Sequence, residues 1–251
     1  MAKIRVPQIT SLKGQRQIKA LTAYDYTFAK LLNQAEIDIV LVGDSLSNIV
    51  QGKKNTINVT MDQMVYHTAC VAKACKYSLA VSDMPFMSYQ ISNEQALENA
   101  TRLFQEGHAE AVKLEGGENI AERIEILVKY DLPVMGHIGL TPQSYHNLGG
   151  HKRQGENNST KKSKQIMKDA KAVADAGAFA VVLECIPDDL AKEITASIKI
   201  PTIGIGSGQH CDGQIAVTHD VLGFKKAPGF ITPEEQLSEV IIGAVTRYFE
   251  E

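Results

Sequence analysis

The chain has 251 residues, of which 44% are apolar and 22% are charged, so its composition is that of a globular protein able to bury a large core. The formal net charge is −3 with both signs scattered, which argues against a nucleic-acid or membrane surface. No apolar run approaches the roughly 20 residues of a membrane helix, no signal-like run opens the chain, and the cysteines form no C-x-x-C pair. We therefore expect a cytoplasmic protein with reduced thiols.

Short apolar runs alternate with longer amphipathic stretches along the chain. Several runs are rich in Val and Ile and too short for helices, as buried parallel strands are. We expect strands at Ile18–Ala23, Ile37–Gly43, Leu79–Ser82, Ala111–Leu114, Pro133–Gly136, Phe179–Leu183, Pro201–Ile205 and Val217–Gly223. Eight strand–helix units favour an α/β fold closed into a single (β/α)8 (TIM) barrel over residues 1–251, with a doubly wound open sheet as the alternative.

Three intervening stretches begin with the capping-box pattern, in which side chains satisfy backbone N–H groups of the first helical turn. The pairs are Thr60 with Gln63, Ser92 with Gln95, and Thr232 with Glu235. In the third stretch Pro233 takes the first helical position, where its missing N–H costs nothing. Apolar residues then recur from Leu237 to Tyr248 at three- and four-residue spacing, which predicts a final helix whose apolar stripe covers another surface.

Two loop segments each allow two interpretations. Ser144–Lys164 follows the fifth strand and is too long for an ordinary connection, so it is either a mobile active-site loop or a solvated excursion. Gly204–Gly208 follows the seventh strand, where backbone N–H groups can cradle a phosphate. Tight packing at a turn explains these glycines equally well.

Polar residues collect where five consecutive strands end. They are Asp44, Asp83, Lys113 with Glu115, His137 and Glu184. Barrel enzymes keep their active sites at this end of the strands. Residues two apart share a face of a strand, so Lys113 and Glu115 point the same way, and Val112 and Leu114 face the helices. Helix caps or a Lys–Glu pair that only fills the barrel are the alternatives, but the coincidence over five strands favours a functional site.

Four carboxylates in one barrel mouth either take up protons or bind a cation. Carboxylates with a single imidazole nearby favour a hard ion such as Mg²⁺ over zinc, which prefers histidine and cysteine. Lys113 is the fixed cation of the set. The residues alone do not separate Mg²⁺ from Mn²⁺ and related ions.

Seven ordered blocks carry a resemblance to a known family. They are Leu21–Tyr26 (LTAYDY), Leu41–Leu46 (LVGDSL), Asp83–Phe86 (DMPF), Val112–Gly117 (VKLEGG), Gly136–Gln143 (GHIGLTPQ), Val182–Cys185 (VLEC) and Ile203–Gly208 (IGIGSG). In order and spacing they resemble the ketopantoate hydroxymethyltransferase (3-methyl-2-oxobutanoate hydroxymethyltransferase) family. The resemblance covers about Lys19 to Gly223. Ser207 stands where the family usually has alanine, and the part from Phe224 onward resembles the family poorly.

The resemblance implies a (β/α)8 barrel assembled as a homodecamer. It also implies transfer of a hydroxymethyl group from 5,10-methylenetetrahydrofolate to 3-methyl-2-oxobutanoate, giving ketopantoate in pantothenate biosynthesis. Carried over by motif, the metal ligands for Mg²⁺ in each subunit are Asp44 and Asp83, with Glu115 in or next to the coordination sphere. The oxo acid is bound at the same place by Asp44, Ser45, Asp83 and Lys113, with His137 on the substrate side. Glu184 is the general base.

Two other functions stay open on the residues alone. Lys113 can be the Schiff-base nucleophile of an aldolase that acts on a 2-oxo acid, although Glu115 beside it favours a charged lysine. Another metal-dependent aldolase is equally compatible with the acids. A barrel that only binds a metabolite or acts as a scaffold gains nothing from clustered like charges, and the acids argue against it.

Overall fold

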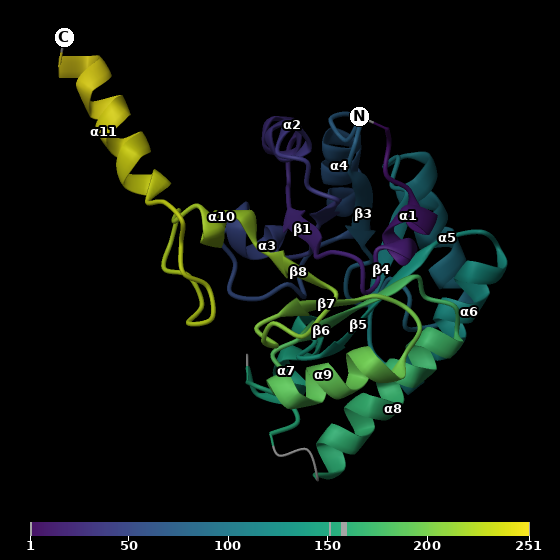
Figure 1. Cartoon of the computed structure of the whole chain (residues 1–251). Coiled ribbons are helices and arrows are strands. Elements are labelled where there is room, and N and C mark those ends of the chain that lie inside the picture. Colours follow the sequence, from purple (N-terminus) through teal and green to yellow (C-terminus); the bar gives the residue numbers. More distant parts are fainter. Residues whose placement is uncertain (1, 151, 157–159, 251) are drawn as a thin grey trace. The chain divides into compact units, whose positions relative to one another are not determined.

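Eight short parallel strands pair in sequence order and close into a barrel (Figure 1). The computed structural model describes residues 2–150, 152–156 and 160–250. The strands are β1 (Ile18–Thr22), β2 (Ile39–Val42), β3 (Leu79–Asp83), β4 (Ala111–Glu115), β5 (Val134–Gly139), β6 (Ala180–Glu184), β7 (Thr202–Ile205) and β8 (Gly213–Ala216). The predicted (β/α)8 barrel is confirmed, and the open-sheet alternative is wrong.

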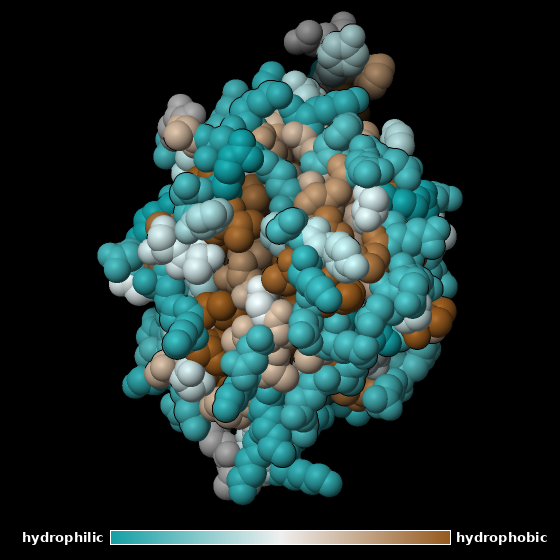
Figure 2. Space-filling model, turned by 90° about the vertical axis from the view of Figure 1, so that its right-hand side faces the viewer, coloured by the Kyte–Doolittle hydropathy of each residue, from teal (hydrophilic) through white to brown (hydrophobic). Residues whose placement is uncertain are grey.

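Helices connect most consecutive strands. They are α1 (Val6–Ser11), α2 (Tyr26–Gln34), α3 (Leu46–Ile49), α4 (Met61–Ala72), α5 (Asn93–Gln105), η1 (Glu118–Ile120), α6 (Ala121–Lys129), η2 (Pro142–Ser144), α7 (Tyr145–Leu148), α8 (Lys161–Asp175), α9 (Asp188–Ser197), α10 (Thr218–Val221) and α11 (Leu237–Glu250). Hydrophilic residues cover most of the face that carries α5, α6 and α8, with apolar patches recessed between them (Figure 2). Within the described ranges, no helix has both the length and the apolar character needed to cross a bilayer.

The chain separates into two compact units, residues 1–215 and 216–251. The first holds the barrel strands through Ile215, and the second holds α10 and α11. That residues 1–251 form a single domain stays a prediction.

Two apolar clusters separate the inside of the barrel from its outer layer. On β2, Ile39 and Leu41 belong to the inner cluster, whereas Val40 and Val42 pack in the larger cluster that includes helix residues. The side chain of Ile9, from α1, joins the inner cluster. The interior is therefore apolar along the first residues of the strands, which leaves their carboxyl ends for polar side chains.

The predicted eighth strand, Val217–Gly223, is wrong in position. The strand is β8, which pairs through Gly213 with Ile203, while α10 occupies most of the predicted segment. A Cβ atom on Gly213 would lie 2.6 Å from Ile18, so only glycine fits between β8 and β1. A strand that needs glycine and is only four residues long gives no apolar run to recognise.

Two of the predicted helix starts are confirmed. Thr60 and Gln63 form a complete capping box at α4, with hydrogen bonds of 3.3 and 3.1 Å. At α5 the hydroxyl of Ser92 accepts from the N–H of Gln95 at 3.2 Å, but the Gln95 side chain accepts from Ile91 instead.

The predicted start of the last helix at Thr232 is wrong, because α11 begins at Leu237. Within the second unit, the N–H groups of Glu234 and Leu237 donate to the carbonyls of Val221 and Leu222, at 2.8 and 3.0 Å. The segment before α11 is held against the end of α10 rather than wound into a helical turn.

The predicted long loop Ser144–Lys164 is partly helical. It contains α7, and α8 begins at Lys161. Residues 151 and 157–159 lie outside the described residues, so closure of this loop stays a prediction.

Candidate active site

Strand alternation places the charged residues inside the barrel. On β4, Lys113 and Glu115 follow Ala111 on the inner face, and all three are buried. Val112 and Leu114 pack in the outer cluster with the helices, as predicted. The inner row of the strand thus changes from apolar to charged toward its carboxyl end.

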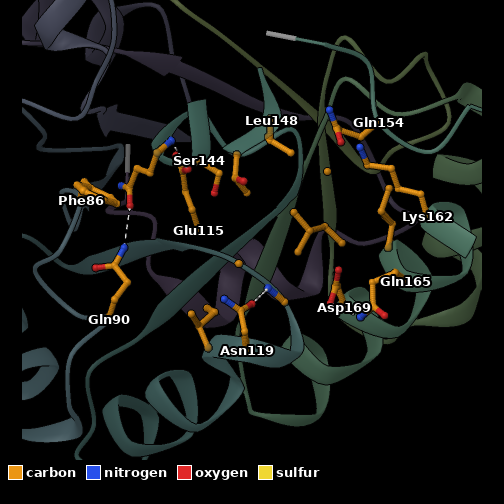
Figure 3. Close-up of a pocket in the computed structure, with 18 of the residues that line it drawn as sticks. Phe86, Gln90, Glu115, Asn119, Ser144, Leu148, Gln154, Lys162, Gln165 and Asp169 are labelled. Carbon is orange, nitrogen blue, oxygen red and sulfur yellow. Dashed lines mark hydrogen bonds between the residues drawn. The ribbon is translucent and has the colours of Figure 1, made fainter. Parts of the chain in front are cut away.

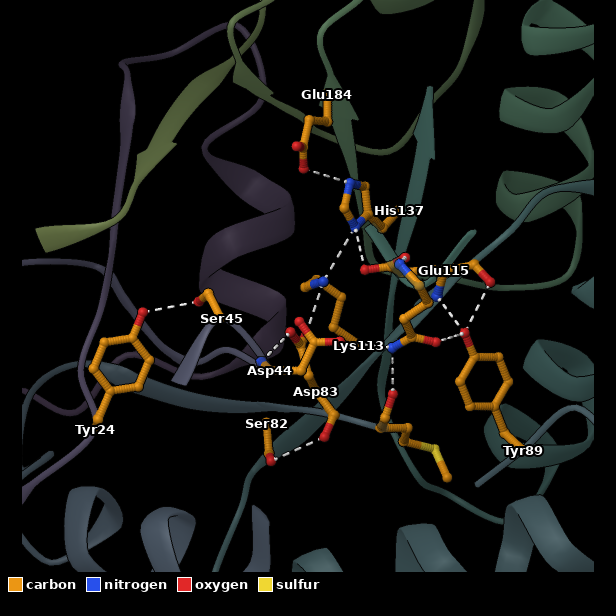
Figure 4. A network of polar contacts seen from close by, with 12 residues as sticks. Tyr24, Asp44, Ser45, Ser82, Asp83, Tyr89, Lys113, Glu115, His137 and Glu184 are labelled. Atoms are coloured by element: carbon orange, nitrogen blue, oxygen red, sulfur yellow. Dashed lines mark hydrogen bonds and ion pairs between the residues drawn. The ribbon is translucent and has the colours of Figure 1, made fainter. Parts of the chain in front are cut away.

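Lys113 is the centre of the buried polar cluster (Figure 4). Its ammonium forms an ion pair with Asp83 Oδ1 at 2.8 Å and lies 3.2 Å from Nδ1 of His137. The backbone N–H of Asp44 donates to the other oxygen of Asp83 at 2.9 Å. Strand register explains this arrangement, because Asp83 pairs with Lys113 and Glu115 pairs with His137.

His137 connects the cluster to Glu184. Its Nδ1 lies 3.5 Å from Glu115 Oε1, and its Nε2 lies 3.0 Å from Glu184 Oε2. Burial and the charge of Lys113 oppose protonation of the ring. The two carboxylates outweigh them and raise the pKa of His137 to about 9, so the imidazole is charged at neutral pH.

The carboxylates carry more negative charge than their burial favours. Burial, together with the charges of Asp83 and Glu115, raises the pKa of Asp44 well above its ordinary value. Burial also opposes ionisation of Glu115, but contacts with His137 and the charge of Lys113 lower its pKa below the ordinary value. A cation added beside Asp44 would relieve this repulsion.

The donor set fits a hard divalent cation in its chemistry. Asp44, Asp83 and Glu115 are buried and offer only carboxylate oxygens, the ligands that Mg²⁺ prefers. Among the described residues, no three His, Cys, Asp or Glu side chains converge as a ready-made metal cage. Mg²⁺ usually binds through one or two carboxylates and completes its shell with water and substrate oxygens, so a full protein cage is not required.

The electrostatics of Lys113 argue against a Schiff-base role. Burial lowers the pKa of this lysine, but Asp83 and Glu115 outweigh it and raise the pKa above its ordinary value. An imine-forming lysine must be neutral to attack a carbonyl. In this cluster Lys113 is a fixed positive charge.

Ser45 lies at the edge of the cluster. Its hydroxyl is 2.8 Å from the hydroxyl of Tyr24, which lies two residues after the end of β1. Tyr24 is buried, and burial raises its pKa, so its hydroxyl stays neutral. The pair holds a hydroxyl beside the acids. Tyr24 lies in one of the quoted blocks but is not among the predicted site residues.

Gln143 and Tyr89 are buried residues of the cluster that are not among the predicted site residues. The side-chain amide of Gln143 donates to Asp44 Oδ2 at 3.0 Å, and its backbone N–H donates to Glu115 Oε2 at 2.9 Å. Tyr89 donates to the side-chain oxygen of Gln143 at 2.9 Å. The signal for Gln143 is its place in the block after β5, whereas Tyr89 lies in the loop after β3, outside the quoted blocks.

The glycines after β7 serve packing. A Cβ atom on Gly208 would lie 1.7 Å from Asp188 Oδ1, and one on Gly204 would lie 3.1 Å from Cys211 Sγ. A carboxylate against the loop disfavours a phosphate there. The packing interpretation of Gly204–Gly208 is therefore the better supported one.

A closed (β/α)8 barrel with buried acids, a lysine and a histidine at the carboxyl ends of its strands defines the class of barrel enzymes that act on small polar substrates. The model of the family described as ketopantoate hydroxymethyltransferase matches residues 3–251. The chain belongs to this family. The match extends beyond Phe224, past the part in which the ordered blocks lie.

Two relatives illustrate the similarity. The chain is 51% identical over 252 residues to the 3-methyl-2-oxobutanoate hydroxymethyltransferase of Pelobacter propionicus, covering 99% of this chain and 93% of that protein. It is 49% identical over 252 residues to the protein of the same name from Pyrococcus furiosus, covering 100% and 88%.

Solved structures at low identity share the fold. The crystal structure of 2,3-dimethylmalate lyase, a PEP mutase/isocitrate lyase superfamily member, has a TM-score of 0.67 at 12% identity, covering 100% of this chain and 86% of that one. A phosphonopyruvate hydrolase has a TM-score of 0.63 at 12% identity, covering 98% of both chains. These likenesses agree with the barrel.

Proposed function

We propose that this protein transfers a hydroxymethyl group from 5,10-methylenetetrahydrofolate to 3-methyl-2-oxobutanoate, giving ketopantoate (2-dehydropantoate) for pantothenate biosynthesis. Family membership and the names of its relatives support the activity. The observation that carries it is the buried cluster, in which three carboxylates and Lys113 meet a Glu184–His137 pair.

In this proposal Asp44 and Asp83, with Glu115, hold Mg²⁺. When bound, the ion supplies Lewis-acid polarisation of the keto group. Lys113 and Ser45 bind the oxo acid, since a charged ammonium and a hydroxyl complement its carboxylate. The charge of Lys113 also favours negative charge that develops on the substrate during the reaction.

Glu184 is the proposed base. It takes the proton from C3 of the oxo acid, and His137 holds the carboxylate through Oε2 at 3.0 Å. The C3 carbanion then forms the new bond to the one-carbon unit. In the net reaction both C–N bonds of the methylene bridge break, and water supplies the new hydroxyl. The hydrogen from C3 and the second hydrogen of water end on N5 and N10 of tetrahydrofolate.

Two further properties stay proposals, an assembly implied by the family resemblance and a location favoured by the composition and cysteine pattern of the chain. We propose a homodecamer and a cytoplasmic location, with no nucleic-acid or membrane partner. All described residues of α11 have at least partly exposed side chains, including Ile241 and Val245, which leaves apolar surface for contact with another subunit.

Deuterium exchange at C3 of 3-methyl-2-oxobutanoate tests the proposed base. With Mg²⁺, the wild-type protein is expected to exchange this proton, and Glu184→Gln is expected to slow exchange by at least roughly 100-fold, the usual scale of general-base catalysis. Glu193→Gln is the matched control, because Glu193 is exposed on α9. NMR spectroscopy follows loss of the C3 proton signal, with and without a chelator.

The outcomes separate the parts of the proposal. Exchange that continues in the presence of the chelator contradicts the proposed need for Mg²⁺. Exchange that continues in Glu184→Gln contradicts the proposed role of Glu184 as the base. A wild-type protein that shows no exchange, with or without tetrahydrofolate, and makes no ketopantoate contradicts the proposed substrate.

A further inference from the structure

A cavity of about 320 Å³ adjoins the polar cluster (Figure 3). It is bounded by the segments that follow β3, β4 and β5 and by α8 from Lys162 to Asp169. Its volume is at the lower end of the range of small-molecule sites. The roles proposed above for the oxo acid and for Mg²⁺ leave this space without a function.

The cavity shares a wall with the proposed oxo acid site. Glu115 and Gln143 line the cavity and also belong to the cluster, and Gln143 donates to Glu115 at 2.9 Å. A carbon–carbon bond forms only when the reacting atoms approach to about 3–3.5 Å. A second substrate must therefore bind in space that adjoins the first, as this cavity does.

Asp169 gives the cavity a hydrogen-bond acceptor. Its Oδ1 accepts from the N–H of Glu118 at 3.0 Å and from Gln165 at 3.1 Å. No residue in the described part of the chain donates to its other oxygen. A half-buried carboxylate with one oxygen available is suited to a ligand that presents N–H donors.

The backbone is built to admit Asp169 at this place. A Cβ atom on Gly117 would lie 2.1 Å from Cγ of Asp169, so any other residue at position 117 would push α8 away. Gly117 belongs to the block after β4, and the proposed chemistry makes no use of it. The position of Asp169 explains why glycine is required at position 117.

The rest of the lining favours a flat heterocycle over an anion. Ile120, Ile138 and Ile166 provide apolar walls. Among the described lining residues the cation is Lys162, against two carboxylates, which disfavours a phosphate-rich ligand. Figure 3 shows Lys162 and Asp169 on the opposite side of the cavity from Glu115.

From these features we infer that the cavity binds the pterin ring of the reduced folate, with the N–H groups of its aminopyrimidinone edge directed at Asp169. This inference rests on the proposed function, because it assigns a place to the one-carbon donor of that reaction. The opposite edge of the ring, which carries the one-carbon unit, then faces the wall formed by Glu115 and Gln143.

The test replaces Asp169 by asparagine in the full-length protein with Mg²⁺. Asparagine keeps an acceptor for Glu118 but presents an NH2 group to the N–H donors of the ligand. The KM for 5,10-methylenetetrahydrofolate is expected to rise roughly tenfold or more, far more than the KM for the oxo acid. The Kd for tetrahydrofolate, measured by titration calorimetry, is expected to rise in parallel. Asp175→Asn, on the same helix but outside the cavity, is expected to change neither constant.

Three outcomes overturn the inference or the proposal beneath it. An unchanged KM for 5,10-methylenetetrahydrofolate in a folded Asp169→Asn variant contradicts binding of the pterin in the cavity. A rise confined to the KM for the oxo acid assigns the cavity to that substrate instead. A wild-type protein that transfers nothing from folate contradicts the proposed function. In that case the Kd for tetrahydrofolate alone tests whether the cavity binds the pterin. Equal Kd values for wild type and variant contradict this binding.

Discussion

The side-chain amide of Gln143 uses all of its hydrogen-bonding capacity. Its nitrogen donates to Asp44 and to the carbonyl of Met84, at 3.0 and 2.9 Å, and its oxygen accepts from Tyr89 and Gln90, at 2.9 and 3.2 Å. An amide has two donors and two acceptor positions, so this network fixes its orientation. One oxygen of Asp44 is held, and the other is left for a cation.

Replacing Gln143 by methionine is expected to weaken metal binding. Methionine has a similar size but cannot orient Asp44, and loss of such outer contacts typically costs about 10–100-fold in metal affinity. Electron paramagnetic resonance titration with Mn²⁺ measures the Kd of the purified protein. Gln105→Met, at the exposed end of α5, is the matched control. Equal Mn²⁺ affinity for the two variants would show that Gln143 has no part in holding the ion.

The contrast between Gln143 and the charged residues shows what sequence can predict at the residue scale. Lys113 and Glu115 were assigned because two charges at period-two spacing on a buried strand require partners. Gln143 is uncharged and lies in the single short turn of η2, where no periodicity says which way a side chain points. Its role depends on how the loop folds back over β4, which only the three-dimensional structure gives.

At the scale of elements, Gly136 sets how closely α8 lies to β5. A Cβ atom on Gly136 would lie 2.3 Å from Cγ1 of Val173, a fully buried residue of α8. Valine has little freedom to turn away because it is branched at Cβ. The helix that carries Asp169 therefore depends on glycine at position 136.

A double-mutant cycle tests this contact. Gly136→Ala is expected to lower the free energy of unfolding by about 1–3 kcal/mol through overpacking. Val173→Ala is expected to lower it by roughly 2 kcal/mol through lost apolar contact. The double variant is expected to lose less than the sum, because the smaller residue at 173 makes room for the new methyl group. Urea unfolding gives the three values, and strict additivity would contradict the contact.

Strand β8 shows why element positions were predicted unevenly. The first seven strands contain Val, Ile, Leu or Ala in recognisable runs, and each was expected close to its observed place. Gly213–Ala216 has the sequence GQIA, in which glycine is required by contact with Ile18 and glutamine is exposed. The position of β8 is determined by tertiary contact. The local sequence pattern therefore predicts a strand in the more apolar segment that follows it.

At the scale of the whole molecule, buried charge makes stability depend on pH. His137 faces Lys113, Glu115 and Glu184, and the two carboxylates raise its pKa from 6.5 to about 9. A raised pKa in the folded state means that the protonated ring stabilises the fold. This stabilisation is complete below pH 6.5 and is lost as the pH rises through about 9.

The metal-free protein is therefore expected to lose stability between pH 6.5 and 9, with a contribution from His137 on the order of 3 kcal/mol. In His137→Gln this contribution is absent, so the free energy of unfolding of the variant is expected to change less over the same range. Urea unfolding in the presence of a chelator, at half-unit steps of pH, compares the two proteins. The difference between their curves isolates His137 from the other histidines, which are common to both. Parallel curves would mean that the ring is neutral in the folded protein. It could then donate to only one of Glu115 and Glu184, because a neutral imidazole carries a single N–H group.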